Sequence, residues 1–173
     1  RGAVNVTGID PSTKNIAISS SKYPWARSVV ATLREFAGEN LELFDVAIAI
    51  LVFEHIQNLR EAFGDVNKLL RTGGRFYLIV CDKDYSVSND KELRSIGFVS
   101  VEIIKALEGD AVETKTARDL TDGSSSVMYD IFRPVEQVRE AAKTEGLTLI
   151  TEQALLSSTA TPVPMLHVLV FTK

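Results

Sequence analysis

The sequence lacks the features that mark disulfide-bonded, membrane-spanning or nucleic-acid-binding proteins. Its single cysteine, Cys81, excludes an internal disulfide and cannot build a zinc site alone. The longest uninterrupted apolar run is Val46 to Phe53, far short of the roughly 20 residues that cross a bilayer. Nineteen Lys and Arg against 23 Asp and Glu give a net charge of −4, so no broad basic face exists for a phosphate backbone. We therefore expect no membrane and no nucleic-acid partner.

Length and composition are those of a globular chain. The 173 residues are enough for one domain, which we expect to span residues 1–173. The 45% hydrophobic content, with ten Gly and five Pro, excludes disorder and collagen-like repeats. Arg1, Gly2 and Ala3 lead straight into a strand-like segment without a charged leader and apolar signal region. A cytoplasmic protein is the expectation.

Strand-like and helix-like patterns alternate through the first half. Alternating apolar residues predict a strand over 3–10, followed by a helix to about Ser21 with Asp10 as its cap and Pro11 at its first position. Further strands are predicted at 28–32, 44–50 and 75–80, with an amphipathic helix over 59–70. This order predicts an α/β fold: a Rossmann-like, open, mostly parallel twisted sheet with helices on both faces.

The second half predicts a cover and an antiparallel edge. Between 82 and 133, polar stretches interrupt short β-like pieces at 99–104 and 112–117, which indicates an inserted region over a substrate. Pro134 opens a helix that ends at Gly146. The strands predicted at 147–150 and 165–171 are joined by a loop, so they should form an antiparallel C-terminal edge pair.

Function is expected at the carboxyl ends of the parallel strands, because open α/β sheets bind ligands there. Asp10 closes the first strand, and its carboxylate could accept hydrogen bonds from both hydroxyls of a ribose. The alternative is that Asp10 only caps the helix that follows.

Three segments in this order resemble the successive motifs of class I S-adenosylmethionine-dependent methyltransferases. They are Gly8-Ile9-Asp10-Pro11-Ser12, the stretch from Phe44 to Ile56, and the stretch from Leu69 to Phe76. Residues 130–147 also resemble the late helix and strand of the small-molecule members related to the ubiquinone and menaquinone methyltransferases.

The resemblance implies S-adenosylmethionine as cofactor and methyl transfer to a small molecule. It implies cofactor contacts by the following residues: Asp10 at the ribose, Pro11 and Ser12 on the adenosine side, Thr32 and Leu33 around the adenine, and Ala49, Ile50 and Leu51 along the methionine part. Thr32 departs from the acid that the family often has at this position. Asp45 more often supports structure in that family.

The larger departure is an absence. The family has a Gly-rich turn after its first strand, where glycine lets the backbone approach the methionine part closely. No such turn occurs here. We expect that the chain begins after the family's first strand, loop and helix, because a sheet without that central strand would leave unpaired edges. The alternative is a degenerate, non-catalytic binding or scaffold module.

No catalytic residue is assigned, because the sulfonium is already a reactive methyl donor and the protein mainly aligns the acceptor. Histidine is the residue type most often used as a base near neutral pH, but the place of His55 before a helix is more typical of packing than of a base. His167 is expected to be structural, and Asp82, Asp84 and Asp90 fit a solvated loop better than a magnesium site. The acceptor region should include His55, Tyr85, Tyr129, Phe132 and Arg133.

Two other enzyme classes fit less well. A nicotinamide oxidoreductase could use Asp10 equally, but no tyrosine is followed four residues later by the lysine that short-chain dehydrogenases need. A serine hydrolase is disfavoured because no Gly-x-Ser-x-Gly elbow occurs. A homodimer is left open.

Overall fold

The computed structural model describes residues 2–88, 98–119, 124–157 and 163–173. Its strands are β1 (Thr7–Asp10), β2 (Arg27–Val30), β3 (Phe44–Ile50), β4 (Leu70–Cys81), β5 (Phe98–Ala106), β6 (Val112–Asp119), β7 (Ser125–Phe132), β8 (Thr148–Leu156) and β9 (Pro164–Thr172). Its helices are α1 (Thr13–Lys22), α2 (Leu33–Glu39), α3 (Leu59–Leu69), α4 (Lys83–Ser88) and α6 (Val135–Thr144), with short 3-10 turns η1 (Phe53–His55) and η2 (Glu108–Asp110). None of the helices in these ranges has the length and apolar content to span a membrane.

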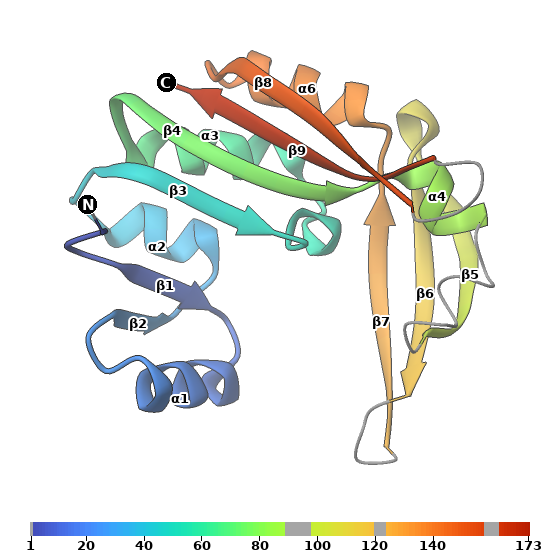
Figure 1. Cartoon of the computed structure of the whole chain (residues 1–173), viewed down its shortest axis with the longest axis horizontal. Helices are drawn as coiled ribbons and strands as arrows, with labels where there is room; N and C mark the ends of the chain where they lie inside the picture. Colours follow the sequence, from blue (N-terminus) through green and yellow to red (C-terminus); the bar gives the residue numbers. More distant parts are fainter. Residues whose placement is uncertain (1, 89–97, 120–123, 158–162) are drawn as a thin grey trace.

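The strands form three sheets (Figure 1). β1 pairs with β2, β3-β4-β9-β8 form a four-stranded sheet, and β5-β6-β7 form a third. Only the β1–β2 and β3–β4 pairs are parallel; the other pairings are antiparallel. The α/β class and the antiparallel pairing of the last two strands are confirmed. The prediction of one mostly parallel sheet is matched only in part, because β9 lies antiparallel beside β4 and the 98–132 region builds a separate antiparallel sheet.

The first helix begins later than the sequence pattern indicated. Ser12 is the N-cap of α1, and its hydroxyl accepts the backbone N–H of Asn15 at 3.3 Å. The prediction of Asp10 as the cap and Pro11 as the first helical residue is therefore wrong. The reason is that the Ser12 hydroxyl reaches the N3 amide, which leaves the Asp10 carboxylate at the strand end.

The helix α2 is not among the elements predicted from the sequence. Its N-cap Thr32 and Glu35 form a reciprocal capping box, in which each side chain binds the other residue's backbone N–H. The Thr-x-x-Glu spacing was the signal, and the short helix buries one residue, Phe36.

The main core lies on one face of the four-stranded sheet. α3 and α6 pack there, against the inward side chains of β4 and β9. Four rings joined by five ring–ring contacts form its centre, with the centroids of these pairs 5.1 to 6.2 Å apart. These rings are Phe53, Phe63, Phe76 and Phe171. Gly146 closes α6 with a φ of 82°, a conformation that glycine adopts without steric cost.

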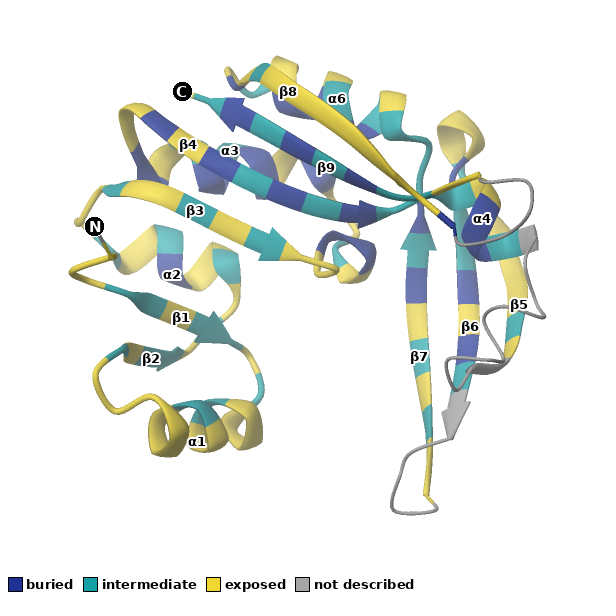
Figure 2. Ribbon diagram, in the orientation of Figure 1, coloured by how far each residue is buried: buried dark blue, intermediate teal, exposed yellow. Residues whose placement is uncertain are grey.

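The opposite face of the same sheet is open. Val46, Ile48 and Ile50 of β3 are 46%, 67% and 55% exposed, and Figure 2 shows the strand as a band of exposed and half-buried residues. No described helix lies over this face, so the expectation of helices on both faces is wrong for this sheet. In the described part of the chain, β1 pairs only with β2 and β3 only with β4, so both have a free edge.

The β5–β7 sheet stands at one end of the molecule. The carboxyl ends of β1, β3 and β4 all point toward it (Figure 1). The 82–133 region thus contains a helix, α4, and a three-stranded antiparallel sheet rather than short β-like pieces alone. This arrangement leaves the candidate site between the strand ends and that sheet.

Candidate functional site

The carboxylate of Asp10 lies at the carboxyl end of β1. One oxygen accepts the backbone N–H of Ser12 at 2.7 Å, and the other accepts the Asn15 side-chain amide at 3.1 Å. A carboxylate offers about four lone-pair sites, so both oxygens can accept a further hydrogen bond. Asp10 is half-buried and held in one orientation, while Pro11 beside it is exposed.

Thr32 and Leu33 lie beside Asp10. The backbone N–H of Ala31 donates to the carbonyl of Asp10 at 3.2 Å, which joins the ends of β1 and β2. The Thr32 hydroxyl donates to Oε2 of Glu35 at 2.8 Å. The hydrogen bonds from Thr32 lower the pKa of the Glu35 carboxyl below its usual value. A carboxylate thus lies next to Thr32, supplied by Glu35 rather than by residue 32.

The end of β3 places its three predicted cofactor residues differently. Ala49 packs toward the core, and Ile50 faces the open side of the sheet. Leu51 has a φ of 53°, in the left-handed region, and its N–H donates to the carbonyl of Ile79 at 2.9 Å. Backbone strain of this kind concentrates at functional sites, and here it turns the chain out of β3 at the edge where ligands are expected.

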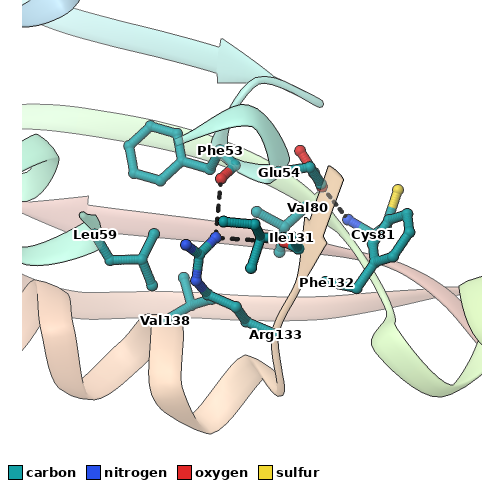
Figure 3. Close-up of a pocket in the computed structure, with 9 residues that line it drawn as sticks. All are labelled: Phe53, Glu54, Leu59, Val80, Cys81, Ile131, Phe132, Arg133 and Val138. Atoms are coloured by element: carbon teal, nitrogen blue, oxygen red, sulfur yellow. Dashed lines mark hydrogen bonds between the residues drawn. The ribbon is translucent and has the colours of Figure 1, made fainter. Parts of the chain in front are cut away.

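The turn at 53–57, which follows β3, is fixed from two sides (Figure 3). The guanidinium of Arg133 donates to the carbonyls of Phe53, Ile56 and Gln57 at 3.3, 2.6 and 3.0 Å, and also to that of Ile131. From the other side, Oε1 of the buried Glu54 accepts the backbone N–H of Cys81 at 2.7 Å. Arg133, a predicted acceptor residue, thus has its donors directed at backbone carbonyls, which fits a positioning role.

A small cavity adjoins this turn. Its volume is about 10 Å³, and Glu54, Cys81 and Arg133 are among its lining residues. That is room for one water and far too little for a substrate. Burial, reinforced by Glu54, raises the pKa of the Cys81 thiol to about 12, and burial lowers that of Arg133. The thiol is therefore protonated at neutral pH and unsuited to nucleophilic chemistry.

His55 is the outward-facing residue of the same turn. Its Nδ1 lies 2.9 Å from Oδ1 of Asp130 on β7, with the His55 side chain 51% exposed and that of Asp130 8% exposed. Burial raises the pKa of Asp130, and the neighbouring His55 acts in the opposite direction. The described structure joins these two residues into a pair of one buried carboxylate and one accessible imidazole.

The other predicted acceptor residues are placed less favourably. Tyr85 in α4 and Phe132 at the end of β7 are 7% and 8% exposed, so neither offers much surface to a ligand. Tyr129 is 58% exposed, and strand alternation places it on the opposite face of β7 from its neighbour Asp130. Their acceptor contacts stay predictions, and His55 is the member of the set with both exposure and a polar anchor.

The surroundings of the second histidine, His167, are those of a structural residue. His167 on β9 is 7% exposed, and its Nε2 lies 3.0 Å from Oδ2 of Asp82. Asp82 also accepts the backbone N–H of Tyr85 at 2.8 Å, and Asp84 pairs with Lys83. Asp90 lies outside the described residues. The described acids here are engaged with protein partners, and no group of three or more metal-ligating side chains occurs in the described ranges.

The carboxylates at this site fit part of a nucleoside cofactor. Asp10 supplies free acceptor capacity at the carboxyl end of a parallel strand, as ribose hydroxyls require. Glu35 supplies a second carboxylate beside Thr32. The methionine part of S-adenosylmethionine needs a close backbone approach, and the described residues at the ends of β1 and β3 offer no glycine turn for it. The fit therefore covers the adenosine half.

Three polar residues of the site were missed by the sequence reasoning. Asp130 is the only charged residue in the apolar run 127–132, and a charge in a strand of that kind needs a partner. Glu35 was signalled by the capping-box spacing. Glu54 gave no signal of its own, because only the fold brings its carboxylate to the end of β4.

Comparison with known proteins agrees with this architecture. Residues 1–78 match the methyltransferase domain family. The chain is 30% identical over 90 residues to the mitochondrial ubiquinone biosynthesis O-methyltransferase of Rattus norvegicus, covering 48% of this chain and 26% of that protein. The chain thus spans about a quarter of the length of this curated relative.

Solved methyltransferase structures match nearly the whole chain. One from Listeria monocytogenes, described as a putative S-adenosylmethionine-dependent methyltransferase, has a TM-score of 0.69 at 16% identity, covering 99% of this chain and 81% of that one. The 1,6-didemethyltoxoflavin-N1-methyltransferase of Burkholderia thailandensis has a TM-score of 0.60 at 13% identity, covering 98% and 61%. At these identities the likeness establishes the fold.

The first 78 residues thus match a methyltransferase domain family, and nearly the whole chain has the fold of S-adenosylmethionine-dependent methyltransferases. Both findings support the predicted class I methyltransferase family and its cofactor, S-adenosylmethionine.

Proposed function

We propose that this protein binds S-adenosylmethionine through Asp10 and transfers a methyl group to a hydroxyl oxygen of a small molecule. The observation that carries the proposal is the oriented, half-buried Asp10 carboxylate at the carboxyl end of β1, in a chain with the methyltransferase fold. Oxygen is favoured as the methylated atom because the rat relative is named as an O-methyltransferase. A small acceptor is supported by the Burkholderia structure, which contains a bound small-molecule acceptor.

The chain's own residues have a positioning part in this reaction. Asp10 would hold the ribose, and Pro11, Ser12, Thr32 and Leu33 would surround the adenosine, with the Glu35 carboxylate beside Thr32 as an acceptor for an adenine amino group. Ala49, Ile50 and Leu51 would line the path toward the methyl group. When bound, the sulfonium supplies the activated methyl, so the protein aligns the acceptor oxygen and excludes water.

The free edges of β1 and β3 support a further strand in the complete site. Both strands point the same way, and within the described ranges neither is paired on the side facing the other. A parallel strand between them would pair both edges, and a glycine turn after it would supply the methionine contact that these residues lack. We propose that the full cofactor site includes such a strand.

Calorimetric titration with S-adenosylhomocysteine tests the proposal, using this chain and a longer chain that includes any upstream coding sequence. Asp10→Ala should weaken binding by about 1 to 3 kcal/mol, because the ribose loses hydrogen bonds to a charged acceptor. Asp45→Ala is the matched control, since Asp45 is an exposed carboxylate at the other end of β3 that pairs with Arg71.

The outcomes separate the candidates. Unchanged affinity in Asp10→Ala would remove the ribose assignment. Absence of binding in both chains would contradict the enzyme proposal and favour the non-catalytic scaffold module that the sequence left open.

A further inference from the structure

His55 and Asp130 come from distant parts of the chain to form one hydrogen-bonded pair. His55 lies in the turn after β3, and Asp130 lies on β7 of the antiparallel sheet. The 2.9 Å between Nδ1 and Oδ1 is a good hydrogen-bond length. An ionised carboxylate only accepts, so Asp130 fixes the proton on Nδ1. Nε2 of the neutral ring then carries a lone pair that is free to accept a proton.

The exposure of the two side chains differs in the way that a base and its anchor require. Asp130 is shielded, with 8% of its side chain exposed, whereas 51% of the His55 side chain is accessible. Within the described ranges, no protein group is hydrogen-bonded to Nε2 of His55. Because the His55 side chain is half exposed, Nε2 is open to solvent or to an acceptor hydroxyl.

The turn that carries His55 is held rigidly. Arg133 binds the carbonyls on both sides of His55, those of Phe53 and of Ile56, and Glu54 is anchored on the Cys81 amide. These charged groups face the inner side of the turn, and the Cys81 thiol beside them is neutral. His55 is thus a fixed imidazole on a braced turn, placed just beyond the strand end where Leu51 leaves the sheet.

We propose that His55 is the general base that removes the acceptor's hydroxyl proton, with Asp130 as its positioning residue. This inference rests on the proposed function and deepens it by assigning an acceptor hydroxyl that is not ionised by itself, as in a phenol. The acceptor O–H proton passes to Nε2 of His55 while the oxygen forms a bond to the methyl carbon. The methyl carbon–sulfur bond breaks, its electron pair stays on sulfur, and the imidazolium is balanced by the Asp130 carboxylate.

The decisive variant is His55→Asn. The asparagine amide can still donate to Asp130 but has no basic nitrogen, so folding and S-adenosylhomocysteine affinity should persist. With catechol as acceptor, kcat should fall by about 10² to 10⁴ with little change in KM. The loss should be smaller with 4-nitrocatechol, whose hydroxyl is more acidic and needs less help from a base. His167→Asn is the matched control, because it removes the other histidine–aspartate pair, whose histidine is buried.

A second readout does not depend on activity. The chain has two histidines, so ¹⁵N NMR of the imidazoles is assignable by single substitution. His55 should show a neutral ring protonated at Nδ1, and Asp130→Asn should shift it toward the mixture of tautomers of a free imidazole. In His167→Asn the His55 signals should stay unchanged.

Each result supports or overturns the assignment. Wild-type kcat in His55→Asn, an equal loss with both catechols, or a predominantly Nε2-protonated His55 would overturn it. Binding of S-adenosylhomocysteine without methylation of either catechol would also overturn it, because the base would then have no hydroxyl to act on. Absence of cofactor binding would instead overturn the proposed function, a failure that calorimetry identifies separately.

Discussion

The two faces of the four-stranded sheet are both apolar in sequence, but only one of them is buried. On the face covered by α3 and α6, Phe76 and Leu78 of β4 are 1% and 0% exposed. On the other face, Ile48 of β3 is 67% exposed. Both faces are apolar, but β3 turns its small alanines toward the core and its large side chains outward. The uncovered face therefore has the composition of a surface made to be buried.

An apolar strand pattern predicts which surfaces are suited to burial, but it does not identify the element that covers them. A nearly continuous apolar run, as in 44–50, is typical of a parallel strand covered on both sides. Here it forms a parallel strand with one covered side and one free edge. The pattern indicates which surfaces favour burial, while the covering element has to be found elsewhere.

The largest expected effect concerns thiol reactivity along the open face. Strand alternation places Cys81 on the same side of β4 as Tyr77 and Ile79, but near the β5–β7 sheet. With its pKa raised to about 12, Cys81 has a thiolate fraction of about 10⁻⁴ at pH 8, against about one quarter for an ordinary cysteine of pKa about 8.5. Iodoacetamide should therefore label Cys81 about 10³-fold more slowly than Ile48→Cys in a Cys81→Ser background.

The two labelling rates should also differ in how they change with pH. Between pH 8 and 10 the Cys81 rate should rise about tenfold per pH unit, because the thiolate fraction rises with pH below the pKa of about 12. The rate of Ile48→Cys should level off above about pH 9. Equal labelling rates would show that the end of the face near the third sheet is as open as its middle.

The next effect concerns stability. Phe63→Ala should lower the free energy of unfolding by about 3 to 5 kcal/mol, because Phe63 is fully buried among three other rings. Ile48→Ala on the open face should change it by less than about 0.5 kcal/mol. Urea unfolding monitored by circular dichroism measures both. A cost above about 2 kcal/mol for Ile48→Ala that depends on protein concentration would mean that a second copy covers this face.

The smallest effect concerns the strained end of β3. Leu51→Gly should leave stability unchanged or raise it by up to about 1.5 kcal/mol, because relief of the left-handed backbone, about 1 to 2 kcal/mol, offsets the entropy cost of glycine, about 0.5 to 1 kcal/mol. Leu43→Gly is the control. Leu43 is 59% exposed and is not among the described residues with positive φ, so its replacement should only destabilise. Equal losses in thermal unfolding would contradict strain at Leu51.

Much of the first half of the fold could be predicted from the sequence. The strand at 44–50 and the helix from Leu59 were fixed by local apolar periodicity, which the structure follows closely. α2 was hidden because its seven residues are too few for a periodic signal, although its capping box was legible. The split into three sheets could not be predicted, because strand partners depend on contacts between distant segments.

The site was partly predictable for a similar reason. Asp10 follows from its place at a strand end, which is a local property. The partnership of His55 with Asp130 joins positions 75 apart, since 130 − 55 = 75. No spacing rule connects such positions, so the sequence alone favours packing for His55 and gives Asp130 no partner.

The bracing of the 53–57 turn also constrains when the site can form during synthesis. Arg133 is 80 residues from Phe53 and 77 from Ile56, so the carbonyls around His55 stay without this donor until the β5–β7 region has been made. Closing a loop of that length carries an entropic cost before its contacts form. A ribosome-bound chain halted before Arg133 would therefore carry the β3–β4 pair with its histidine turn still unfixed, and the turn would become ordered late, when the third sheet docks.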